Sequence, residues 1–409
     1  EGKGGGEARA AKRRNLAVVE AKELGVIYAS TGERALNGAS VVLRTGEIVG
    51  LFGRNESGKT TLARAITNQV PVISGSVRFK GYETGSEPSI PYWICALSAA
   101  LAAVILNAAR LVHSLPDKGT SLKQALIRNQ RDQQPSHPGI VLAQLLYKFL
   151  TETGCWDQIY FIMFAFLVLI SEFLIRHIRH QRRCADISRR VVHITSEDNP
   201  GRRDFRDEWS IRKALFKEMP MRMTEEQKEA RALCLLKAGK LQLYDREGNP
   251  WGDAERYLDS DVKLARCSGG QRHLIYVLSK LAAEPEVVVA DEILVGLDLP
   301  TQARMLTILQ YMVTVRNVAL LYISTDANPF DFLCQRVLFM QNGRITAEGT
   351  PMEIMHGSKL KAIQEYLGAM RENARRTSHL GNLREELFKS VKSVRVLMQE
   401  AFGKVPTHM

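Results

Sequence analysis

The sequence predicts an α/β fold, in which a mainly parallel sheet is flanked by helices, and three observations support this prediction. An apolar run at 47–52 leads into a glycine-rich loop and then into a helix with apolar residues at helical spacing. A small-residue turn at 267–271 heads a second amphipathic helix. A third apolar run, 287–290, ends in Asp291 and Glu292. Short apolar runs bounded by glycine or polar residues are typical of strands that are buried on both faces.

The glycine-rich loop is a candidate phosphate site. Residues 53–60 read GRNESGKT and fit the pattern G-x-x-x-x-G-K-[ST]. Backbone N–H groups of such a loop, together with the start of the following helix, point at a bound phosphate. Lys59 would reach the β and γ phosphates, and the Thr60 hydroxyl would ligate Mg²⁺. The nucleotide contacts expected here are Gly53, Asn55, Ser57, Gly58, Lys59, Thr60 and Thr61.

Two later motifs identify a family resemblance. Residues 267–271 read CSGGQ, one residue away from the LSGGQ signature of ATP-binding-cassette (ABC) ATPases, and residues 287–292 read VVVADE. With the phosphate loop upstream, this order resembles the ATP-binding subunits of ABC transporters over 16–84 and 191–354, with an importer-like (sugar or oligopeptide) flavour. The resemblance implies an α/β ABC ATPase P-loop fold, with a RecA-like core, an antiparallel edge sheet and an α-helical subdomain.

The resemblance also implies roles for individual residues. Asp291 would hold Mg²⁺ through water, and Glu292 would polarise the hydrolytic water. Ser268, Gly269, Gly270 and Gln271 would close on ATP held by the phosphate loop of a second cassette, aided by the helix N-terminus. Tyr28 lies where the family has an aromatic residue that stacks on adenine, although a lone tyrosine in a β run can also be a packing residue.

Two expected catalytic positions depart from the family. Ser196 aligns with the glutamine that contacts Mg²⁺ and the attacking water, and Thr325 aligns with a histidine that contacts the γ-phosphate. Threonine can donate a hydrogen bond but carries no charge and reaches less far. Glu56 places a negative charge near the phosphates where a glycine is common. We therefore expect ATP binding to survive these changes better than hydrolysis at this site, with Glu292, Thr325 and Ser196 as its catalytic residues.

The middle of the chain does not fit an ordinary cassette. The surplus length falls in 87–186, which contains apolar stretches at 92–112 and 159–178. A membrane span needs about 20 largely apolar residues, and the arginines that follow the second stretch are what the positive-inside rule expects on the cytoplasmic side. The sequence is compatible with a helical transmembrane hairpin of two spans. It is also compatible with a soluble helical insertion whose apolar faces pack together or against a partner.

Composition and motif positions give a domain division. The chain is 45% apolar and 24% charged, as in globular proteins. Its net charge is +12, and positively charged residues cluster beside the apolar insertion. This favours an anionic membrane surface over nucleic acid as the partner. The six cysteines form no C-x-x-C pair, which argues against zinc and a disulfide framework. The predicted parts are a flexible basic leader (1–15), cassette core (16–86), helical insertion (87–186), cassette core (187–356) and C-terminal helical tail (357–409).

These observations predict an ATP-binding subunit of a membrane ABC transporter complex, with ATP and Mg²⁺ as cofactors and attenuated hydrolysis at its own site. Its partners would be a second cassette, identical or related, and separate membrane permease subunits, because two candidate spans are too few for a translocation path. No nucleic-acid partner is expected. The ATPase core would lie on the cytoplasmic or organelle-matrix side of the membrane. The alternative is a degenerate cassette that serves as a structural or regulatory ATP-binding scaffold.

Overall fold

The computed structural model describes residues 16–84, 171, 174–175, 177–187, 189–195, 207–244, 247, 249–326, 329–377 and 380–402. Contacts divide the chain into two compact units, one formed by 86–183 and the other by the residues on both sides of it. In the first of these, the described residues between Ser171 and Arg183 are helical. The apolar stretches predicted at 92–112 and 159–178 otherwise lie outside the described residues. Among the residues that are described, no helix has both the length and the apolar character to span a bilayer.

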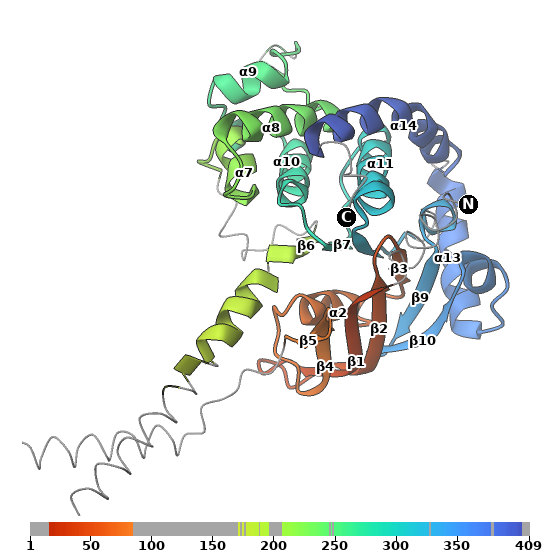
Figure 1. Cartoon of the computed structure of the whole chain (residues 1–409). Helices are drawn as coiled ribbons and strands as arrows, with labels where there is room; N and C mark the ends of the chain where they lie inside the picture. Colours follow the sequence, from red (N-terminus) through yellow and green to blue (C-terminus); the bar gives the residue numbers. More distant parts are fainter. Residues whose placement is uncertain are drawn as a thin grey trace, which may run out of the picture. The chain divides into compact units, whose positions relative to one another are not determined.

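The larger unit is built around a six-stranded sheet with the order β10-β9-β3-β8-β7-β6 (Figure 1). Five neighbouring strands are parallel, and β10 pairs with β9 antiparallel. The strands are β3 (Ile48–Phe52), β6 (Val191–Thr195), β7 (Val287–Asp291), β8 (Ala319–Ile323), β9 (Arg336–Gln341) and β10 (Arg344–Gly349). This confirms the predicted α/β class, and the strand predicted at 287–290 is β7.

The register of the parallel strands aligns the ends that carry the candidate site residues. Thr195 pairs with Asp291, Asp291 with Ile323, and Ile323 with Leu51. The segments that follow these four positions therefore start side by side at the carboxyl edge of the sheet, where parallel α/β sheets bind their ligands.

A second, antiparallel sheet has the order β2-β1-β4-β5. Its strands are β1 (Ala17–Ile27), β2 (Arg34–Arg44), β4 (Ser74–Phe79) and β5 (Tyr82–Glu83). Between it and the large sheet lies α2 (Lys59–Ile66), whose buried residues include Leu62, Ala65 and Ile66. This is the helix that the sequence predicts after the phosphate loop.

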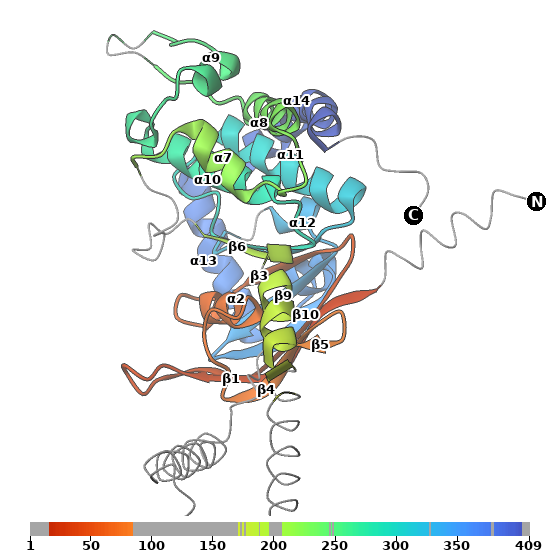
Figure 2. The same cartoon turned by 60° about the vertical axis from the view of Figure 1, so that its left-hand side comes forward.

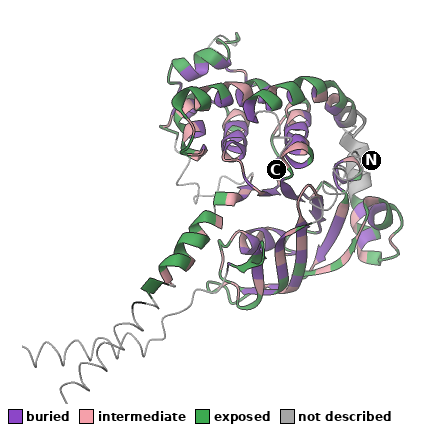
Figure 3. Ribbon diagram, viewed as in Figure 1, coloured by how far each residue is buried: buried purple, intermediate pink, exposed green. Residues whose placement is uncertain are grey.

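Two apolar cores form because successive side chains of a strand point to opposite faces of the sheet. In β7, Val288 and Ala290 belong to the core shared with the helices, whereas Val287 and Val289 belong to the core shared with α2, β1 and β2. Both faces of the central strands are covered, so these strands are buried along their whole length (Figure 3). This is the reason that their sequences read as uninterrupted apolar runs.

Most helices cover one face of the large sheet (Figure 2). They are α7 (Ile211–Glu218), α8 (Glu225–Gly239), α9 (Ala254–Asp259), the short helix η1 (Leu264–Arg266), α10 (Gly269–Ala282), α11 (Leu299–Arg316) and α14 (Leu380–Phe402). The remaining helices are α12 (Phe330–Leu333), η2 (Met352–His356) and α13 (Lys361–Thr377). In α14, Leu383, Leu387, Val394 and Met398 are buried in the core shared with α8 and α11. These four residues form an apolar seam of α14 that packs within the chain.

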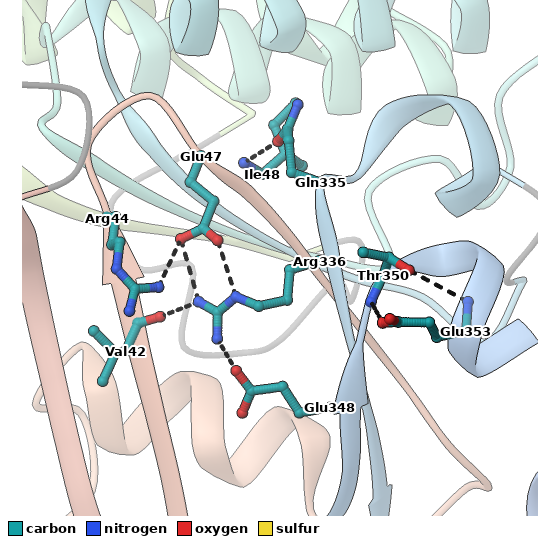
Figure 4. Close-up of polar contacts among 9 residues, drawn as sticks. All are labelled: Val42, Arg44, Glu47, Ile48, Gln335, Arg336, Glu348, Thr350 and Glu353. Carbon is teal, nitrogen blue, oxygen red and sulfur yellow. Dashed lines mark hydrogen bonds and ion pairs between the residues drawn. The ribbon is translucent and has the colours of Figure 1, made fainter. Parts of the chain in front are cut away.

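A polar network joins the two sheets (Figure 4). Arg336, at the start of β9, donates from Nε to Oε1 of Glu47 at 2.9 Å and from Nη2 to Oε2 at 3.2 Å. The same guanidinium contacts the Val42 carbonyl in β2 and the Glu348 carboxylate in β10. Glu47 itself lies in the turn between β2 and β3. The half-buried Arg336 guanidinium therefore connects the edge of the antiparallel sheet to the strand that leads into the phosphate loop.

Candidate nucleotide-binding site

The glycine-rich loop has a shape that glycine alone permits at two positions. Gly53 has φ +155°, and a Cβ there would lie 2.2 Å from the Met340 carbonyl oxygen. Gly58 has φ +102°, and a Cβ there would lie 2.6 Å from the Ala35 carbonyl oxygen. The loop is also held from β9–β10, because the Gly343 amide donates to the Ser57 carbonyl at 2.9 Å. These contacts fix the shape of the loop that precedes α2, and a fixed loop conformation is what phosphate binding requires.

Lys59 is the first residue of α2, directly after this loop, and is 7% exposed. Its ammonium donates to the carbonyl oxygens of Gly53 and Arg54, each at 2.9 Å. Burial lowers the pKa of Lys59, and the charges of Glu292 and Asp291 oppose this decrease. The structure thus brings together the lysine and the two carboxylates that the sequence places more than two hundred positions apart.

Glu292 follows β7 in a strained backbone conformation, with φ +53°. Its amide donates to the Ile323 carbonyl at 3.0 Å, and its Oε1 accepts from the Thr325 amide at 2.6 Å. Burial raises the pKa of Glu292, and hydrogen bonds from the Thr325 amide and hydroxyl oppose this increase. A half-buried carboxylate of raised basicity, fixed by two donors, is suited to accept a proton from water.

Two buried side-chain oxygens at the predicted Mg²⁺ and phosphate site lack hydrogen-bond partners in the described structure. In the described part of the chain, Oγ of Ser57 and Oδ1 of Asp291 are buried and have no hydrogen-bond partner. Asp291 is 2% exposed. The described residues contain no cluster of three or more His, Cys, Asp or Glu that could hold a metal alone. One carboxylate and the neighbouring Thr60 hydroxyl fit Mg²⁺, which is usually bound by one or two protein oxygens together with waters and phosphates.

Tyr28 lies beside the phosphate loop. Its hydroxyl is 3.1 Å from Oγ1 of Thr61, in the first turn of α2, and the residue is half-buried. The sequence predicts that its ring stacks on adenine, and the contact with Thr61 holds that ring next to the loop. Asn55 and Glu56 are exposed at the tip of the loop, and Glu56 has φ +64°.

The signature turn is a helix N-terminus at the surface. Ser268 caps α10 in a capping box: its hydroxyl accepts from the Gln271 amide at 3.3 Å, and the Gln271 side chain accepts from the Ser268 amide at 2.7 Å. Ser268 and Gly269 are exposed, and a Cβ on Gly269 would meet no atom within 4 Å. Within the described part of the chain, no hydrogen bond or ion pair connects this turn with the phosphate loop. Ser196 lies outside the described residues.

The sequence does not predict one residue of the site, Tyr366. Tyr366, in α13, donates a hydrogen bond of 2.6 Å from its hydroxyl to the Thr325 carbonyl. Its ring packs against Phe52, the last residue of β3, at a centroid distance of 5.7 Å. The sequence around Tyr366 is a charged helical segment without a motif, so only the packing of α13 against the sheet reveals it.

The sequence comparisons agree with this geometry. Residues 36–131 match the family model described as "ABC transporter". The chain is 33% identical over 87 residues to an oligopeptide transport ATP-binding protein of Mycoplasma pneumoniae, which covers 21% of this chain and 10% of that protein. It is 24% identical over 133 residues to a methionine import ATP-binding protein of Staphylococcus aureus, which covers 32% of this chain and 39% of that protein.

The chain is also similar to a solved ATP-binding cassette dimer in a post-hydrolysis state with ADP and Pi, at 15% identity and a TM-score of 0.48, over 81% of this chain and 98% of that one. The matched region spans about a tenth of the length of the oligopeptide transport proteins of two Mycoplasma species. Residues 36–131, which include the phosphate loop, are thus similar to the ATP-binding domain of ABC transporters.

Proposed function

We propose that this chain is the ATP-binding subunit of a membrane ABC transporter complex. The observation that carries the proposal is the convergence of Lys59, Asp291 and Glu292 at the carboxyl edge of the sheet, beneath a loop shaped by Gly53 and Gly58. The relatives named for oligopeptide transport and methionine import support a role in transport. The proposed partners are a second cassette and separate permease subunits, and the proposed place is the cytoplasmic or matrix face of a membrane.

Binding of ATP would use groups that are already in position. The Lys59 ammonium would exchange its two carbonyl partners for oxygens of the β and γ phosphates, because charge-assisted bonds to phosphate are stronger than bonds to neutral carbonyls. The loop amides and the first turn of α2 would hold the same phosphates. Bound Mg²⁺, held by Asp291 and Thr60, would supply charge neutralisation, and the Tyr28 ring would cover the adenine.

Completion of the site would require a second cassette. The exposed Ser268–Gly269 turn of α10 carries the positive end of a helix dipole and leaves room for a phosphate to approach the backbone. A partner cassette would present this turn to the γ-phosphate that is bound by Lys59. Gly270 and Gln271 support the turn, since Gln271 bonds both Ser268 and the Gln242 carbonyl.

Hydrolysis at this site is proposed to be slow. Glu292 would accept the proton of the attacking water, and Thr325 would hold Glu292 in place. The Thr325 amide donates to Oε1 of Glu292 at 2.6 Å. The Thr325 side chain carries no charge, so it would stabilise the γ-phosphate less than a longer, cationic side chain at this position. The same observation supports the second candidate function, a scaffold that binds ATP without turning it over at a useful rate.

An ATPase assay on the intact complex separates the two functions. The full chain is purified in detergent with the proteins that accompany it, and wild type is compared with Glu292→Gln. Glu255→Gln, at a side chain that is 59% exposed, is the matched control. A transporter subunit predicts that permease-type membrane proteins copurify and that Glu292→Gln alone lowers turnover, by roughly a hundredfold or more. Equal turnover of wild type and Glu292→Gln would show that this chain is not a working catalyst.

A further inference from the structure

We propose that Tyr366 is a positioning residue for hydrolysis, through which the C-terminal helix α13 sets the geometry of Thr325 and hence of Glu292. This inference rests on the proposed ATPase function and assigns a role to a segment that lies outside the cassette motifs. The proposal stands on a continuous series of contacts, Tyr366 to Thr325 to Glu292, made by neighbouring groups at the carboxyl edge of the sheet.

The first step is the contact with Thr325. The Tyr366 hydroxyl donates to the Thr325 carbonyl at 2.6 Å, while the amide of the same residue donates to Oε1 of Glu292 at 2.6 Å. Both the amide and the carbonyl group of Thr325 are thus hydrogen-bonded. It lies two residues beyond the end of β8, between Ser324 and Asp326, and the Asp326 amide donates to the Ser324 hydroxyl at 3.0 Å. The phenol therefore restricts the position from which Glu292 receives its shortest hydrogen bond.

The second step is the position of the phenol itself. Its ring lies against Phe52 at 5.7 Å and against Phe339 at 6.0 Å, both centroid distances, so α13 presents it in one orientation. Burial raises the pKa of Tyr366 to about 12, and the Gly53 amide, acting as a donor to the phenol oxygen, opposes this increase. The hydroxyl thus lies between the first glycine of the phosphate loop and Thr325. A neutral phenol is a donor over the physiological pH range.

The neighbouring residue Glu365 does not account for the hydrogen bond between Tyr366 and Thr325. Glu365 pairs with Arg54 of the loop at 3.3 Å, but the two side chains are 50% and 64% exposed. Ion pairs this exposed contribute little and are screened by salt. Tyr366, and not Glu365, is therefore the residue of α13 that we assign to the site.

The test compares Tyr366→Phe with a matched removal of a phenol hydroxyl. Tyr366→Phe keeps the ring and loses only the hydrogen bonds. Tyr311→Phe is the control, because Tyr311 is buried in α11 and its hydroxyl has no hydrogen-bond partner in the described structure. Both variants are made in the full chain and measured for ATP turnover, KM, binding of a fluorescent ATP analogue, and amide hydrogen exchange of the peptide that contains 319–326.

The account predicts that Tyr366→Phe lowers kcat roughly tenfold, a part of what a correctly placed general base supplies. KM and analogue binding stay within about twofold, because the loop and Lys59 are unchanged. Exchange of the 319–326 amides accelerates by about fivefold, the change allowed by one lost hydrogen bond of ordinary strength. In a Glu292→Gln background, Tyr366→Phe has less than about a twofold further effect, because both changes act on one unit. Tyr311→Phe alters none of these values.

Three outcomes would overturn the proposal. Turnover and exchange of Tyr366→Phe equal to those of Tyr311→Phe would remove the role of Tyr366 and leave the proposed function intact. A rate loss that is fully additive with Glu292→Gln, or that comes with an equal loss of binding, would indicate a general structural role instead. A wild-type chain that binds ATP but shows no hydrolysis with its partners would remove both this inference and the proposed ATPase activity.

Discussion

Glu292 is held by the main chain of Thr325, whose amide donates to its Oε1 at 2.6 Å. A main-chain donor is independent of the side chain, so substitution at 325 leaves this contact in place. The Thr325 hydroxyl adds a second bond to the same carboxylate. We therefore propose that position 325, where the sequence resemblance predicts a histidine, orients the proposed general base Glu292.

Substitution of Thr325 should reveal this division of roles. Thr325→Ala removes the hydroxyl bond and retains the amide bond, so hydrolysis should fall by only about three- to tenfold, as expected for one lost hydrogen bond. Thr325→Ser should restore most of the rate, because serine carries the same donor. Steady-state ATPase rates of the intact complex test this. Complete loss of activity in Thr325→Ser would mean that the methyl group, and not the hydroxyl, matters.

Glu56 should weaken ATP binding for two separable reasons. It holds φ +64°, which is unfavourable for a residue with a Cβ, and its charge lies at the tip of the phosphate loop. Glu56→Gly removes both effects, and we expect its ATP Kd to be roughly three- to tenfold lower than that of wild type. Glu56→Gln removes the charge alone. Its Kd, measured by calorimetry, should fall between the other two, and a Kd above that of wild type in both variants would contradict this account.

Cys267 should be an unreactive thiol. It is 6% exposed, and burial raises its pKa to about 11. At pH 8 its alkylation by iodoacetamide, followed by mass spectrometry, should be roughly a hundredfold slower than in urea, where an unperturbed cysteine has a pKa of about 8.5. The unfolded chain loses this proton at lower pH than the folded chain. This group therefore disfavours folding increasingly as the pH rises from about 8.5 towards 11. Rapid labelling of native protein at pH 7 would contradict the burial.

Arg336 should be important for stability. Its guanidinium fork joins Glu47, Glu348 and the Val42 carbonyl, and its side chain is 16% exposed. Arg336→Ala removes these bonds and leaves Glu47 with only the longer ion pair to Arg44, at 3.8 Å. We expect a loss of about 2–3 kcal/mol in the free energy of unfolding. Arg336→Lys should recover little, since an ammonium cannot replace a bidentate fork. Lys22→Ala, in an exposed pair with Glu20, should cost less than about 1 kcal/mol in the same urea titration.

Where one short segment carries its own signal, the sequence is sufficient to predict the structure. Helix α8 is an example, because Thr224 and Gln227 form a capping box and the apolar spacing is helical. The helix after the signature and the buried strand before Asp291 follow from equally local patterns. The phosphate loop is predicted for the same reason, since its glycines and its lysine are neighbours in the chain.

Contacts between distant segments could not be predicted in this way. Tyr366 reaches Thr325 only because α13 folds back over β3 and β9, and nothing in its local sequence indicates that path. The apolar seam of α14 is compatible with a partner helix as well as with internal packing, and only the placement of α8 and α11 decides between them. The side-chain role expected of Thr325 was incomplete for a related reason, because a sequence alignment does not show what a main-chain amide contacts.

The most direct test of the central claim is equilibrium binding of MgATP to the purified full chain by calorimetry, for wild type and Lys59→Ala. Lys263→Ala, at a side chain that is 55% exposed, controls for the loss of a positive charge. We expect Lys59→Ala to weaken binding by roughly a hundredfold or more, and Lys263→Ala to bind like wild type. Equal affinity of Lys59→Ala and wild type would contradict the claim that the loop at 53–60 is an ATP site.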